Sequence, residues 1–118
     1  MTYSEKLLEG IIDIHIHTNP DLRLRRLSDL ELAVEAQRVG ARAIVIKSHL
    51  FTTVDRAWIA QQATPGGQIF GGIVLNPHVG GLNPVATETA LKMGAKIVWL
   101  PTSWSSNERL RQGKNDGV

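Results

Sequence analysis

Two histidines and an aspartate alternate along one apolar stretch near the start of the chain. Residues 11–18 have the sequence IIDIHIHT, which spaces Asp13, His15 and His17 two residues apart. Side chains of a β-strand alternate between its two faces, so these three would share one face and the isoleucines the other, with both faces buried. Two imidazoles spaced in this way can reach one cation at the roughly 2.0–2.1 Å that zinc requires. Asp13 would then orient a ligand from behind.

A second polar pair ends the next apolar stretch. Lys47 and His49 are also two residues apart, so an inward His49 brings Lys47 to the same face. A lysine there can act as a base, carry a carbamate whose oxygens bind metal, or pair as an ammonium with Asp13 or a substrate anion. We therefore expect metal ligands at His15, His17 and His49, and proton-transfer roles for Lys47, Asp13 and His78.

The surrounding sequence predicts alternating strands and helices. β-branched runs predict four strands, at 11–17, 42–48, 69–75 and 96–100. Helical periodicity and capping residues predict three helices, from Ser28 to Gly40, from about 52 to 63, and from Asn83 to Gly94. This βαβαβαβ order predicts an α/β fold with a parallel sheet. All four histidines fall at or just beyond the end of a strand, on the edge where such folds build active sites.

Length and composition restrict the remaining possibilities. The 118 residues suffice for one domain, expected at 1–104, followed by a polar tail at 105–118 that we expect to be disordered. A net charge of +2 without a basic, aromatic-rich stripe argues against nucleic acid, and no apolar run could span a membrane. The absence of cysteine and of a signal peptide fits the cytoplasm. The basic run Arg23 to Arg26 predicts a solvated loop, or an anion clamp in which Arg23, Arg25 and also Asn76 contact substrate.

The Asp-x-His-x-His motif at the end of a first strand resembles the amidohydrolase superfamily of metal-dependent hydrolases. The ordered strings IIDIHIHTNPD, RAIVIKSH, GGIVLNPHVGGLNP and GAKIVWLPT are similar to an uncharacterised bacterial group of amidohydrolase-like proteins. This resemblance implies a distorted TIM barrel with one or two metal ions, bound by His15, His17 and His49 with Asp13 in support. The PHP phosphoesterases open with a similar D-x-H-x-H-T string, which makes phosphate-ester hydrolysis the alternative chemistry.

The predicted strands amount to half of such a barrel. A complete (β/α)8 barrel has eight strands and about 250 residues, so we expect the N-terminal half, in a truncated chain or in a homo-oligomer of half-barrels. The expected function is hydrolysis of a C–N or C–O bond in a small molecule by a metal-activated water. Zinc is the expected ion, with manganese or iron as alternatives. The competing hypothesis is a non-catalytic metal-binding half-barrel that acts only within an assembly.

Overall fold

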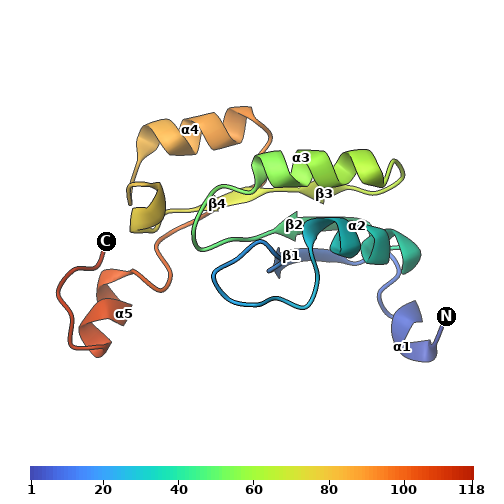
Figure 1. Ribbon diagram of the computed structural model, residues 1–118, viewed down its shortest axis with the longest axis horizontal. Coiled ribbons are helices and arrows are strands. Elements are labelled where there is room, and N and C mark those ends of the chain that lie inside the picture. Colours follow the sequence, from blue (N-terminus) through green and yellow to red (C-terminus); the bar gives the residue numbers. More distant parts are fainter.

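The computed structural model describes residues 1–118 and confirms the α/β class. Strands and helices alternate along the chain, and the chain ends lie at opposite ends of the long axis (Figure 1). The elements are α1 (Tyr3–Lys6), β1 (Ile12–Ile16), α2 (Asp29–Arg38), β2 (Ala43–Ile46), α3 (Val54–Ala63), β3 (Ile69–Phe70), β4 (Gly72–Val74), the 3-10 helix η1 (Pro77–Val79), α4 (Pro84–Lys92), β5 (Ile97–Trp99) and α5 (Ser106–Arg111). None of the helices is both long and apolar enough to cross a membrane.

All strand pairs are parallel, as predicted, but they form two small sheets. One sheet has the order β1-β2-β3 and the other consists of β4 and β5. The strand expected over 69–75 is interrupted at Gly71, where an added Cβ would lie 2.5 Å from the backbone of Thr53 and Val54. The chain that follows β2 therefore passes directly against this strand. The structure has no closed barrel.

Thr53 joins the two sheets at this interruption. Its side chain is fully buried, and its hydroxyl donates to the carbonyl of Ile46 at 2.6 Å. The same hydroxyl oxygen accepts from the backbone N–H of Gly72 at 2.9 Å, and the Thr53 N–H donates to the Gly72 carbonyl at 3.0 Å. Ile46 ends β2 and Gly72 begins β4. The side chain of Thr53 therefore connects these two strands, whereas paired strands within each sheet are connected by backbone hydrogen bonds.

The hydrophobic core lies on one face of the strands. One cluster joins α2, β2, α3 and β3 around Ile44 and Ile46, and a second joins β4 to α4 around Ile73 and Leu75. The expectation that the isoleucines of β1 are all buried is wrong. Ile12 and Ile14 are 57% and 52% exposed, because among the isoleucines of β1 only Ile16 packs against the core.

The helix boundaries largely follow their capping residues. Ser28 caps α2 in a capping box with Glu31, and Asn83 caps α4 with Pro84 at its first position, as predicted. The segment 105–118, which the sequence predicts as a polar tail, contains α5 in the structure. Ser105 caps α5, buried Arg109 pairs with Asp116, and the Val118 N–H donates to the Trp104 carbonyl at 2.8 Å.

Candidate metal centre at the carboxyl ends of the strands

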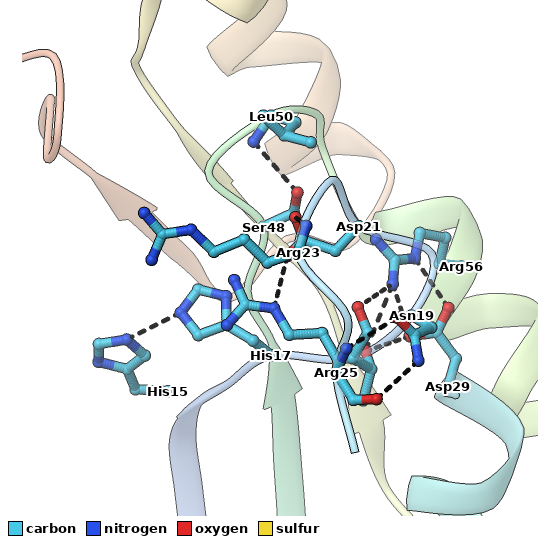
Figure 2. A network of polar contacts seen from close by, with 11 residues as sticks. His15, His17, Asn19, Asp21, Arg23, Arg25, Asp29, Ser48, Leu50 and Arg56 are labelled. Carbon is cyan, nitrogen blue, oxygen red and sulfur yellow. Dashed lines mark hydrogen bonds and ion pairs between the residues drawn. The ribbon is translucent and has the colours of Figure 1, made fainter. Parts of the chain in front are cut away.

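His15 and His17 direct their Nε2 atoms toward each other at the end of β1. The two atoms are 3.2 Å apart, with the ring planes at 70° (Figure 2). Two nitrogens that each lie 2.0–2.1 Å from a tetrahedral zinc ion are about 3.3–3.4 Å apart. The spacing of this pair therefore fits two ligands of one ion.

Asp13 acts on the backbone beside this pair. Its Oδ1 accepts from the N–H of His15 at 2.9 Å, where the register between β1 and β2 shifts between Asp13 and Ile16. No hydrogen bond joins the Asp13 carboxylate to an imidazole ring. Its observed contact fixes the local course of β1 and not a ring tautomer.

The ring of His49 lies against the ring of His17, but its nitrogens are not directed toward the Nε2 atoms of His15 and His17. Their rings are stacked, with centroids 4.8 Å apart and planes at 25°. Because the rings of His17 and His49 are nearly parallel, their nitrogens lie side by side and are not directed toward a common point. His49 Nδ1 is hydrogen-bonded to the hydroxyl of Thr102 at 2.8 Å, which leaves Nε2 as the nitrogen without a protein partner. A turn of the His49 ring would be needed to bring Nε2 toward the nitrogens of His15 and His17.

Asn76 supports His49 from beneath. It is fully buried, and its Nδ2 donates to the His49 carbonyl and to the Thr102 hydroxyl, each at 3.1 Å. Its Oδ1 accepts from the Thr102 N–H at 3.0 Å. The amide predicted to contact substrate is thus already bonded within the protein, and this placement favours a positioning role.

Lys47 reaches the same face from β2. It is only 5% exposed, and its Nζ lies 3.5 Å from His15 Nε2 and 5.0 Å from the centre of the Trp99 ring. No carboxylate lies within ion-pairing distance of it. Burial lowers the pKa of Lys47.

Burial and nearby positive charges favour the neutral form of His17 and of His49. Burial, followed by the positive charge of Arg25 and the neighbouring histidines and Lys47, lowers the pKa of His17 to about 4. Burial, then Lys47 and Arg25, also lowers the pKa of His49. His17 Nδ1 is buried without a hydrogen-bond partner. Neutral imidazole is the form that binds metal, so a lone pair of each of these two rings is available to a ligand.

The loop between β1 and α2 brings Arg25 beside the histidines (Figure 2). Asn19 holds the Arg25 backbone, accepting from its N–H at 3.1 Å and donating to its carbonyl at 2.9 Å. The Arg25 guanidinium donates to Asp21 at 2.7 Å. Arg23 is exposed, and its side chain forms no ion pair. Of the two arginines predicted to bind substrate, Arg25 adjoins the histidines and its charge is matched by Asp21.

A second ion pair anchors the base of this loop. Arg56 from α3 donates to Asp29 through Nε at 2.7 Å and Nη2 at 3.0 Å, and Nη2 also lies 3.3 Å from the Thr18 carbonyl (Figure 2). The hydroxyl of Thr18 donates to Asp29 at 2.5 Å. The residue after His17 is thereby tied to both α2 and α3, which fixes the end of β1.

His78 lies apart from the other histidines. It is exposed on η1, and its ring packs edge-on against Trp104 with centroids 6.0 Å apart. It lines a separate cavity of about 350 Å³ together with Phe51, Val79 and Met93. No contact joins it to His15, His17 or His49.

The complete set of donors does not form a closed cage. The structure contains no group of three or more His, Asp or Glu side chains disposed to hold a metal ion. It contains the Nε2 atoms of His15 and His17 at hydrogen-bonding distance, 3.2 Å, with His49 and Lys47 beside them. As they are placed, His15 and His17 would supply two ligands to an ion, and a third would require His49 to turn or a group from outside the chain.

The family of unknown function DUF6282 matches residues 10–117. The chain belongs to this family. No curated protein and no solved structure matches it. The DUF6282 match includes β1, the three clustered histidines and α5, so it places the segment after residue 104 in the same family unit as the histidines.

Sequence reasoning missed two residues of this part of the DUF6282 domain. Thr102 binds His49 and Trp99 lies beside Lys47. Both are at the carboxyl end of β5, which is the same edge that carries the histidines. Their positions at the end of the predicted strand 96–100 and just after it were the available signal.

Proposed function

We propose that this chain forms the metal-binding part of a metal-dependent hydrolase of the amidohydrolase type, acting on a small molecule. The observation that carries the proposal is the His15–His17 pair, whose Nε2 atoms lie 3.2 Å apart on the carboxyl edge of parallel strands. The neutral state favoured for His17 and His49 supports it. A divalent ion held there, zinc first and manganese or iron next, would supply the Lewis acidity that activates water and polarises the bond to be cleaved.

The chain's own residues have separate roles in this proposal. His15 and His17 hold the ion, and His49 takes a third position after a turn of its ring. If Thr102 accepts the Nδ1 proton of His49, the lone pair of His49 is left on Nε2, as outer partners of metal-binding histidines commonly arrange. Asn76 holds Thr102 in place. His78 has no part in the proposal because it packs against Trp104.

We also propose that the strands are half of a TIM-like barrel, completed by strands of a longer chain or of a second copy. The outer edge of β1 is unpaired, and a groove of about 800 Å³ runs beside it, lined in part by Ile16, Leu30 and Val34. Open parallel edges with apolar flanks are normally covered in native proteins. The lack of cysteine supports a cytoplasmic location.

Metal content and turnover test the proposal. The chain, freed of metal and reloaded with Zn²⁺ or Mn²⁺, is expected to bind the ion stoichiometrically by elemental analysis. The double variant H15A/H17A should lose that metal, whereas H78A should retain it. Ester, lactone, amide and phosphodiester substrates would then be screened with and without chelator.

The outcomes separate the candidate functions. Chelator-sensitive cleavage of an ester, lactone or amide supports the proposed hydrolase. Cleavage of phosphodiesters alone supports the PHP-type alternative, and tight metal binding without turnover supports a non-catalytic module. Unchanged metal content in H15A/H17A refutes the assignment of both ligands.

A further inference from the structure

The molecule has two cationic residues that are less than a tenth exposed, and only one of them has an anionic partner. Arg109 is 8% exposed and forms two hydrogen bonds to Asp116, at 2.6 and 2.7 Å. Lys47 is 5% exposed and has no carboxylate within ion-pairing distance. Burying a charge without a counter-charge is costly, and an anion supplied from outside the chain would offset that cost.

The aspartates that precede and follow the histidine pair have partners other than Lys47. Asp13 uses Oδ1 to accept the His15 N–H, and Asp21 is paired with Arg25. The Lys47 Nζ lies instead 3.5 Å from His15 Nε2 and 5.0 Å from the centre of the Trp99 ring. His15 is exposed, so an incoming group can approach Lys47 beside it.

We propose that Lys47 binds a carboxylate of the substrate. That this ligand is a substrate rests on the proposed function. The positive charge of Arg25 is matched by Asp21, which leaves Lys47 as one buried positive charge without a match. One charge complements a singly charged carboxylate better than a doubly charged phosphate. The ring of Trp99 offers an apolar wall for the carbon chain that bears it.

This placement describes the substrate class. Lys47 Nζ is within 3.5 Å of the same His15 nitrogen that is paired with His17. A carboxylate at Lys47 would therefore lie close to the ion-binding nitrogens. The substrate is a small carboxylic acid whose hydrolysable bond is near the carboxylate.

The test uses the metal-free full chain, so that it does not depend on metal binding. Propionate, its neutral analogue propionamide and inorganic phosphate would each be titrated into ¹⁵N-labelled protein, and backbone amide shifts followed by NMR. We expect propionate to shift the amides of His15 and Lys47 saturably, and propionamide to leave them unchanged. K47M should weaken propionate binding about tenfold to a hundredfold, as expected for loss of a charged hydrogen-bond donor.

Two further variants control the experiment. K96M removes another lysine that lies over an aromatic ring, Phe70, and should bind propionate as the unmodified chain does. K47R keeps the charge and should retain saturable binding even if K47M fails to fold. Equal binding of propionate and propionamide, or wild-type affinity in folded K47M, would overturn the proposal, as would loss of binding in folded K47R. Tighter binding of phosphate than of propionate would overturn the carboxylate assignment.

The two proposals can fail separately. Propionate binding that requires Lys47, in a chain that binds no zinc, leaves the anion site standing and removes the hydrolase. Zinc binding by His15 and His17 without any propionate binding removes the Lys47 assignment and leaves the hydrolase.

Discussion

Lowering the pH toward 4 should destabilise the metal-free fold through His17. The folded environment lowers the pKa of this ring from 6.5 to about 4, chiefly by burial and then by the charge of Arg25. Between these values the unfolded chain takes up a proton that the folded chain rejects. The stability associated with neutral His17 is therefore complete above pH 6.5 and is lost as the pH falls toward 4.

The pKa difference sets the size of this effect. A pKa lowered from 6.5 to about 4 corresponds to a ceiling of about 3 kcal/mol. The His17 ring is partly open to solvent, and screening reduces the expected loss to on the order of 1 to 2 kcal/mol. Burial lowers the pKa of His49 as well, so that ring acts in the same direction.

Urea denaturation with chelator present measures this loss. The free energy of unfolding would be compared at pH 7 and pH 4.5 for the unmodified chain and for H17Q, whose amide does not titrate. The carboxylates and His49 are common to both proteins, so the additional loss in the unmodified chain reports His17. If both proteins lose the same stability, or if the His17 ring titrates near pH 6.5 by NMR, the electrostatic account of the site is incorrect.

Two substitutions test the architecture around the histidines. G71A should lower the free energy of unfolding by about 1–3 kcal/mol in urea melts, because its Cβ would lie 2.5 Å from the backbone of Thr53. G67A is the control, because the nearest contact of its Cβ would be an ordinary 3.5 Å. Equal stability of the two variants would contradict the close packing at Gly71. T102V should weaken zinc binding in equilibrium dialysis about tenfold to a hundredfold, because it removes the hydroxyl that binds His49 Nδ1. Unchanged zinc affinity in T102V would remove His49 from the proposed ligand set.

The fold class and the helix ends could be predicted because they depend on local signals. The capping box at Ser28 and the Asn83-Pro84 pair each consist of residues close together in the sequence, and both are present in the structure. The alternation of strands and helices likewise follows from local periodicity. The bulge in β1 and the break at Gly71 depend on a neighbouring strand and on the chain after β2, which no local pattern reveals.

The candidate site was predictable as a set of positions and not as a geometry. The spacing of His15 and His17 placed both on one face, and the structure brings their nitrogens together. The stacking of His49 on His17 depends on Thr102, 53 residues later in the chain. His78 also lies just after a predicted strand. It packs against Trp104 and not against the other histidines, because η1 carries it away from the end of the strand.

The hydroxyl of Thr53 has a consequence for how the two parts of the site are aligned. His15, His17 and Lys47 are carried by the first sheet, whereas Asn76, Trp99 and Thr102 follow or end strands of the second. Thr53 Oγ1 donates to the carbonyl of Ile46 in the first sheet and accepts from the amide of Gly72 in the second. A valine at position 53 would keep the bulk and the backbone hydrogen bond from its N–H to the Gly72 carbonyl, but it would lose the hydroxyl bonds to Ile46 and to the Gly72 amide. A buried side chain that touches none of the histidines thus helps to hold together the two sheets that carry the site.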